Sequence, residues 1–197
     1  RCRADFYRGF GGRFARWLIA KEIQPSYHSY GNGSGMRVSA AGFMAKSVEE
    51  CIDLATKTAL PTHDHPEGIK GAVATALTIF YGMQGKDKDF IRKQVLDEYY
   101  PNWSALTYEG IKPGYGFDET CQQTIPAALI CFLESKDYED CLKLAIALGG
   151  DADTLAAISG PMAYAFYKTM PEELIANAKA KLPEWMPGQY SHSDSEK

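Results

Sequence analysis

The sequence has little of what marks membrane, secreted or nucleic-acid-binding proteins. No apolar run approaches the roughly 18 residues that a membrane-spanning helix requires, and the first residues lack the hydrophobic segment of a signal peptide. A formal net charge of −4 provides no broad basic field for nucleic-acid phosphates. We therefore expect a soluble, cytoplasmic, monomeric protein that neither enters a membrane nor binds nucleic acid directly.

Cysteine is also scarce, and its spacing excludes two further classes of protein. The chain has five cysteines, an odd number, and no Cys-x-x-Cys pair. This pattern argues against a disulfide framework and against a structural zinc site. Cys121, Cys131 and Cys141 sit among apolar residues, where a free cysteine behaves as a small hydrophobic residue. We expect a reducing compartment.

Convincing strand alternation is absent, and helical periodicity dominates the 197 residues. Residues 101–118 are rich in glycine and proline and are interpreted as a long ordered loop. The helical periodicity predicts an all-α domain with long connecting loops, followed by a polar tail over residues 183–197. Helices are expected to begin at Ser47, Pro66, Asp87, near Thr124, at Asp137, at Asp153 or Thr154, and after Pro171; Pro161 should kink the helix that contains it.

The segment from Gly149 to Thr154 combines two glycines with acidic and hydroxyl side chains. Asp151 and Asp153 would repel each other at short range unless a cation or a helix N-terminus offsets the repulsion. Together with Thr154 they form an all-oxygen set, which suits Mg²⁺ or Mn²⁺ better than zinc. An ordinary helix start explains the same residues, and the segment alone does not decide between the two.

Residues 29–37 alternate glycine with asparagine and serine, a composition that predicts an irregular loop rather than a helix. Such a loop exposes backbone N–H groups in a concave nest that can receive phosphate oxygens. Tyr30 and Met36 could flank a flat ring, and Arg37 could complement the charge of a ligand. The alternative is a flexible glycine loop without a ligand.

Two histidines flank an acidic residue in His63-Asp64-His65, just before Pro66. The three side chains could hold a transition metal, or one histidine at a helix N-terminus could contact a phosphate or a ribose. The same residues also serve as an ordinary helix start. All three possibilities stay open at this point.

Taken together and in this order, the segments resemble the ADP-ribosylglycohydrolase family. The matching blocks are residues 29–38, 63–71 and 148–157, supported by 117–126 and 11–17. The resemblance implies an all-α, orthogonal multi-helix single domain over residues 1–182. It also implies a centre of two Mg²⁺ or Mn²⁺ ions beneath a cleft for ADP-ribose. By that match the metal ligands are Asp151, Asp153 and Thr154, the two aspartates being catalytic, and the residues that contact ADP-ribose are Tyr30, Gly31, Asn32, Ser34, Met36, His63, Gly149 and Gly150.

The sequence departs from the family pattern in one important respect. Family members begin with a Gly-Asp segment and a Thr-Asp-Asp-Thr element, which supply the other metal ligands and a catalytic acid, whereas this sequence contains no Asp-Asp pair. Asp151, Asp153 and Thr154 alone would under-coordinate cations that prefer about six oxygens. We expect the sequence to be a truncated member, lacking the N-terminal metal-ligand segment. Pro161, where small residues are typical, is a minor further departure.

Three functions are compatible with these features. The first is a hydrolase that cleaves the glycosidic bond between ADP-ribose and a protein side chain or small molecule. The second is a non-catalytic module that binds ADP-ribose, and the third is a structural helical protein without a ligand. The linkage that would be cleaved is not predicted, because the discriminating contacts would lie on variable loops such as residues 101–118.

Overall fold

The computed structural model describes residues 10–182, and within that range the backbone forms helices and no β-sheet. This confirms the all-α fold class. Cys2 and the predicted polar tail lie outside the described residues. In chain order the helices are α1 (Gly12–Ile19), α2 (Gly33–Met36), α3 (Ser39–Met44), α4 (Val48–Ala59), α5 (Pro66–Met83), α6 (Lys88–Ile91), the π-helical turn η1 (Arg92–Leu96), α7 (Asp97–Tyr99), η2 (Pro101–Trp103), α8 (Tyr108–Ile111), η3 (Lys112–Gly114), α9 (Cys121–Glu134), α10 (Tyr138–Leu148), α11 (Ala152–Tyr167) and α12 (Glu172–Lys181).

Helix starts that carry a capping side chain lie where the sequence predicts them. The side chains of Ser47, Asp87 and Asp137 each accept a hydrogen bond from the backbone N–H three residues later. These caps satisfy N–H groups that have no partner inside the helix. At the other end of α10, Gly149 adopts a φ of +85° and ends the helix, as its position predicts.

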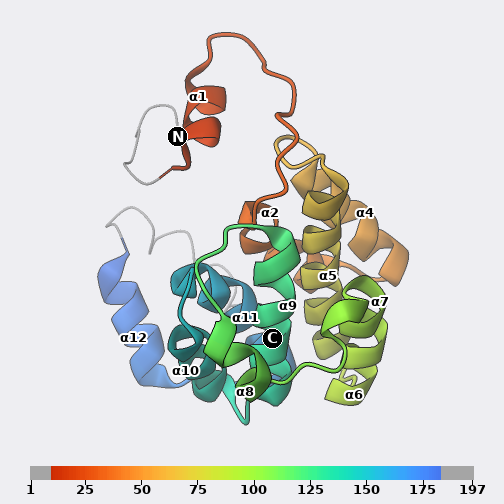
Figure 1. Ribbon diagram of the computed structural model, residues 1–197, viewed down its shortest axis with the longest axis vertical. Helices are drawn as coiled ribbons and strands as arrows, with labels where there is room; N and C mark the ends of the chain where they lie inside the picture. Colours follow the sequence, from red (N-terminus) through yellow and green to blue (C-terminus); the bar gives the residue numbers. More distant parts are fainter. Residues whose placement is uncertain (1–9, 183–197) are drawn as a thin grey trace, which may run out of the picture.

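The core is built around α5, which packs against α3, α4, α9 and α11 (Figure 1). Every residue from 71 to 82 is buried, so α5 is apolar or small on all faces, as a central helix must be. The large side chains that fill the space around it include Ile79, Ile125, Phe132 and Ile158. None of the helices in residues 10–182 is long and apolar enough to cross a membrane.

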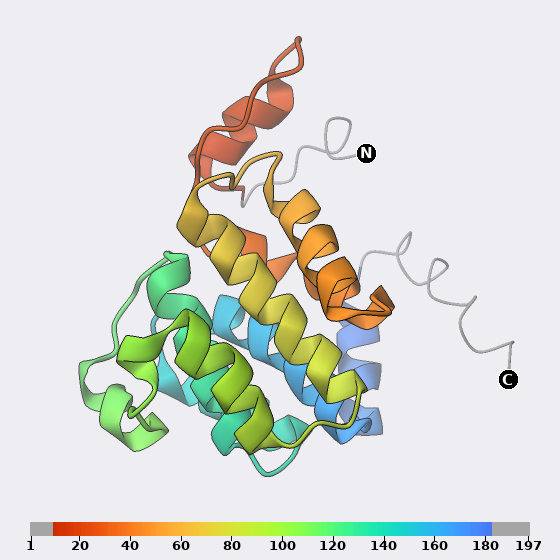
Figure 2. The same cartoon turned by 90° about the vertical axis from the view of Figure 1, so that its right-hand side faces the viewer.

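Figure 2 shows α1 projecting from one end of this helical body, joined to it by an extended segment. The side chain of Arg13 in α1 reaches that segment, where its guanidinium lies 4.9 Å from the centre of the Tyr27 ring and donates to the Tyr27 carbonyl. Trp17 donates to the carbonyl of Pro25 at 3.0 Å. These contacts hold α1 against residues 25–27.

The glycine-rich segment differs from its prediction, because it contains a short helix. Residues 33–36 form the single turn α2, packed between α5, α9 and α11. A Cβ on Gly35 would lie 2.5 Å from Cδ1 of Ile125, so a larger residue there would require the buried Ile125 side chain to shift. The prediction of an irregular loop was wrong for these residues because tertiary packing outweighs the low helical propensity of glycine.

The predicted start of α9 was also wrong, by three residues. The helix begins at Cys121 and contains Pro126 in its interior, although proline normally favours the first turn. The N–H of Cys121 donates to the carbonyl of Tyr30 at 2.9 Å, a long-range contact that fixes the earlier start. Residues 101–118, expected to be a loop, include the short helices η2, α8 and η3.

Candidate functional site

The N-terminal ends of three long helices gather around α2 and the residues just before it (Figure 1). Residues 30–32 run antiparallel beside residues 119–121: Asn32 N–H donates to Glu119 O at 2.7 Å, and Gly31 pairs with Thr120 in an isolated bridge. A Cβ on Gly68, in the first turn of α5, would lie 2.6 Å from Ser29 O. Since helix N-termini carry partial positive charge, this arrangement favours an anionic ligand.

Asn32 joins the glycine segment to the acidic turn that begins α11. Its side-chain Nδ2 donates to Oδ2 of Asp151 at 2.7 Å and to Oγ1 of Thr124 at 3.1 Å. Three residues after Asp151, the hydroxyl of Thr154 lies 3.7 Å from Sδ of Met36. The structure therefore brings together residues 32–36 and 151–154, which the sequence separates by more than a hundred positions.

The acidic turn needs both of its glycines. Gly149 and Gly150 have φ values of +85° and +63°, a conformation that other residues adopt at a cost. A Cβ on Gly150 would lie 2.6 Å from the carbonyl oxygen of Gly116 and 2.9 Å from the ring of Tyr115. Residues 115 and 116 therefore lie directly against the turn. The two glycines are needed for its backbone conformation and for this close packing.

The side chains of this turn fit part of a divalent-metal site. Asp151 and Asp153 offer carboxylate oxygens, and the Thr154 hydroxyl, with its hydrogen directed to Met36, keeps its lone pairs for a cation. Mg²⁺ and Mn²⁺ prefer such oxygen donors. Nowhere in residues 10–182 do three or more histidine, cysteine, aspartate or glutamate side chains converge in a metal-binding group. Asp151, Asp153 and Thr154 could therefore supply one side of the coordination sphere, and not all of the roughly six oxygen ligands that such a cation prefers.

His63 lies buried beneath the glycine segment, with 6% of its surface exposed. The Thr62 hydroxyl accepts from Arg37 at 2.7 Å and lies 2.8 Å from His63 Nδ1. The Arg37 guanidinium, which can only donate, lies 3.4 Å from the same nitrogen, so Nδ1 is assigned as the acceptor. The proton of the neutral ring is then on Nε2, which would lie 3.3 Å from a Cβ on Gly33. Burial first, then the positive charge of Arg37, lowers the pKa of His63 to about 4.

The lowered pKa of His63 predicts an acid-sensitive contribution to stability. The ordinary value is 6.5, so between pH 6.5 and 4 the unfolded chain binds a proton that the folded chain excludes. Stability present above pH 6.5 is lost as the pH falls towards 4, by an amount on the order of 2–3 kcal/mol. In urea unfolding, His63→Gln should have a shallower pH dependence over this window, whereas parallel curves would contradict the assignment.

Arg37 does not face the glycine segment, so the idea that it complements a ligand's charge was wrong. Its guanidinium donates to the carbonyl of Thr58 at 3.0 Å and reaches that of Ala59 at 3.4 Å. These carbonyls end α4, where a cation is favourable. Arg37 therefore ties α2 to the end of α4 and holds Thr62 and His63 in place.

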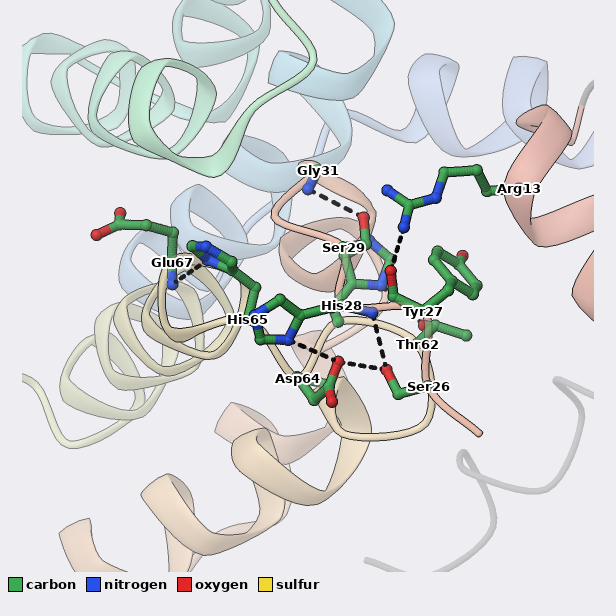
Figure 3. Close-up of polar contacts among 12 residues, drawn as sticks. Arg13, Ser26, Tyr27, His28, Ser29, Gly31, Thr62, Asp64, His65 and Glu67 are labelled. Carbon is green, nitrogen blue, oxygen red and sulfur yellow. Dashed lines mark hydrogen bonds and ion pairs between the residues drawn. The ribbon is translucent and has the colours of Figure 1, made fainter. Parts of the chain in front are cut away.

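The side chains of His63, Asp64 and His65 point to different partners, as Figure 3 shows for Asp64 and His65. His65 accepts the N–H of Glu67 at its Nδ1, 3.1 Å away, and so caps α5. Asp64 accepts from Ser26 at 2.5 Å and lies 3.4 Å from Nδ1 of His28. These contacts do not bring the three side chains together around a metal ion, so they do not support the transition-metal alternative. His65 instead caps α5, as the interpretation of an ordinary helix start predicts.

An open pocket of about 430 Å³ borders the glycine segment. Tyr30 is 45% exposed at this pocket, and its ring centre lies 5.2 Å from that of His65. Ser34, in contrast, is fully buried and donates to Gly68 O at 2.8 Å, so its predicted contact with ADP-ribose stays a prediction. The full lining is Arg13, Ser29, Tyr30, Gly31, Phe117, Asp118, Glu119 and Thr120.

Of these lining residues, Arg13, Ser29 and residues 117–120 were not named as binding residues from the sequence. Ser29 lies in the matching block of residues 29–38, whereas the only signal for the others was the weaker family resemblance of residues 11–17 and 117–126. Asp118 accepts from both the N–H and the hydroxyl of Thr120, at 2.7 and 2.5 Å, which orders the segment beside Gly31.

Comparisons with known proteins identify the family to which the chain belongs. A family model described as ADP-ribosylglycohydrolase matches residues 4–190. The human ADP-ribosylhydrolase ARH3 is 27% identical over 71% of this chain and 50% of its own length, and an uncharacterized protein of Archaeoglobus fulgidus is 28% identical over 75% and 53%. The chain thus spans about half the length of these curated relatives.

A solved structure titled ADP-ribosylglycohydrolase-related protein complex shares the fold. It superposes with a TM-score of 0.64 at 23% identity, covering 82% of this chain and 59% of the other. The family model, which matches nearly the whole sequence, decides the relationship. With its helical core, glycine segment and acidic turn, the chain belongs to the ADP-ribosylglycohydrolase family.

Proposed function

We propose that this chain binds ADP-ribose along the glycine segment and contributes to a hydrolase that cleaves the glycosidic bond between ADP-ribose and a protein side chain or small molecule. The observation that carries the proposal is the 2.7 Å contact between Asn32 and Asp151, which places the glycine segment beside the acidic turn. A ligand held by one segment would then meet the carboxylates of the other. The names of the relatives support the same substrate.

The binding part of the proposal rests on groups that suit a diphosphate and its sugars. The N-termini of α5, α9 and α11 direct partial positive charge towards the glycine segment. His63 offers a neutral Nε2–H donor that keeps its state across physiological pH, because its pKa is lowered to about 4. Tyr30 presents an exposed aromatic face at the pocket of about 430 Å³.

The catalytic part rests on the acidic turn. Asp151, Asp153 and Thr154 would hold Mg²⁺ or Mn²⁺ on one side, and we propose a centre of two such ions. When bound, the metal supplies charge neutralisation and orientation of ribose hydroxyls. Hydrolysis adds the hydroxyl of water to ribose C1″ and its proton to the leaving atom. Asn32 contributes by holding the Asp151 carboxylate in one orientation.

Calorimetry and a turnover assay on the full chain test the proposal. We expect ADP-ribose to bind, to bind more tightly with Mg²⁺ or Mn²⁺ present, and to be released from an ADP-ribosylated peptide only with metal. Inosine monophosphate, which lacks the diphosphate and second ribose, serves as the control ligand. Failure of ADP-ribose to bind under any of these conditions would contradict the proposal.

A non-catalytic ADP-ribose-binding module is the second candidate. It is favoured by the incomplete donor set, since no larger acidic or histidine group accompanies Asp151 and Asp153 in residues 10–182. The same experiments separate the two functions. Binding without turnover, at any metal concentration, identifies the module, whereas metal-dependent release identifies the enzyme.

A further inference from the structure

Asn32 makes a set of contacts that the expected role in ligand binding does not explain. It is only 7% exposed, although it was expected to line the cleft. Its backbone N–H is fixed to Glu119 O at 2.7 Å, and both hydrogens of Nδ2 are used inside the protein. A buried amide with this many internal partners has a single orientation.

The orientation of the amide is decided by Thr124, which is fully buried on α9. The Thr124 hydroxyl has one hydrogen, which it donates to the carbonyl of Asp118 at 3.1 Å. Its oxygen must therefore act as an acceptor towards Asn32, so the amide presents Nδ2 and not Oδ1. The second hydrogen of Nδ2 is then directed to Oδ2 of Asp151.

Building on the proposed function, we propose that Asn32 is a positioning residue that orients the Asp151 carboxylate for a divalent cation and thereby couples cation binding to ADP-ribose binding. Thr124 sets the amide of Asn32, and Asn32 fixes one oxygen of Asp151. Hydrogen bonds of this kind to a ligating carboxylate raise metal affinity because they remove its freedom to rotate.

The coupling follows from the position of Asn32 in the chain. It comes directly after Tyr30 and Gly31, which border the pocket, so a ligand bound there would stabilise the backbone conformation that holds the Asn32 amide against Asp151. By thermodynamic linkage, ADP-ribose should strengthen cation binding by the same factor by which the cation strengthens ADP-ribose binding.

The test measures Mn²⁺ affinity directly, by the electron paramagnetic resonance signal of free Mn²⁺, with and without ADP-ribose. Asn32→Ala should weaken Mn²⁺ binding by about 10- to 100-fold and should remove the effect of ADP-ribose on it. Asn102→Ala, an exposed asparagine in η2, is the matched control and should bind as the wild type does.

Thr124 provides a second pair of variants that keeps the test decisive if Asn32→Ala fails to fold. Thr124→Val removes the hydroxyl at nearly constant volume and should weaken Mn²⁺ binding in the same direction, whereas Thr124→Ser should restore it. Thr78→Val is the control for this change, because Thr78 is also fully buried and its hydroxyl bonds only within α5.

The outcomes separate this inference from the proposed function. A wild-type chain that binds neither Mn²⁺ nor ADP-ribose overturns both. A wild-type chain that binds both ligands, with unchanged affinities in Asn32→Ala or Thr124→Val, overturns the role of Asn32 alone. Equal losses in Thr124→Val and Thr78→Val would show a general loss of stability and would also overturn it.

Discussion

Replacing Asp151 and Asp153 together by asparagine is expected to abolish metal-dependent release of ADP-ribose. Both charges are lost, while the size and the helix-capping ability of the side chains are nearly retained. A divalent cation then keeps only neutral oxygens on this side of its coordination sphere. We expect Mn²⁺ affinity to fall by at least about 100-fold, since several kcal/mol of charge stabilisation depend on the ligands.

The matched control for this pair is Asp53→Asn, an exposed aspartate on α4 that forms an ion pair with Lys57 one turn later. It makes the same substitution at a solvent-exposed position and should leave Mn²⁺ binding and the release of ADP-ribose unchanged. Undiminished release in the Asp151 and Asp153 double variant would remove the acidic turn from the mechanism. If release were undetectable even in the wild type, Mn²⁺ affinity would still report on the turn.

Helix starts that depend on a nearby capping residue were predicted from the sequence. A helix start that depends on contacts with residues far away in the sequence was not. Ser47, Asp87 and Asp137 cap helices with their own side chains, three residues from the group they satisfy. The start of α9 instead depends on Tyr30, which lies far away in the sequence. Propensity is a weak guide where such packing decides the conformation.

The same distinction applies to the candidate site. The acidic turn and the glycine segment are recognisable because their residues are consecutive, and the family pattern joins them. The side chains that connect them are not recognisable in this way: Asn32 could be read as a ligand contact, and Thr124 as a core residue. Only their position in space shows that the Thr124 hydroxyl accepts from the Asn32 amide, which in turn donates to Asp151.

Burial of His63 was equally invisible in the sequence. A histidine beside an aspartate would normally be expected to gain a proton more easily, because the opposite charge favours the imidazolium. In the structure, burial and Arg37 outweigh the effect of Asp64 and lower the pKa of His63 to about 4. The charge of His63 is therefore determined by its burial and by Arg37, and not by Asp64, its neighbour in the sequence.

The close approach of α5 to the glycine segment leads to the other large expected effect. Replacing Gly68 by alanine would place a Cβ 2.6 Å from Ser29 O and 2.8 Å from His63 O. Both are backbone oxygens and cannot rotate away. The gain of helical propensity, at most about 1 kcal/mol, is outweighed by an overpacking cost of about 1–3 kcal/mol or more.

We therefore expect Gly68→Ala to lower the free energy of unfolding in urea and to weaken ADP-ribose binding by tenfold or more, because residues 29 and 63 both border the candidate site. Gly12→Ala in α1 makes the same change at a helical position with no atom within 4 Å and should be neutral or slightly stabilising. A Gly68→Ala protein as stable as Gly12→Ala, with unaltered ADP-ribose affinity, would show that α5 and the glycine segment can separate without loss. The contact between them would then position neither His63 nor the ligand.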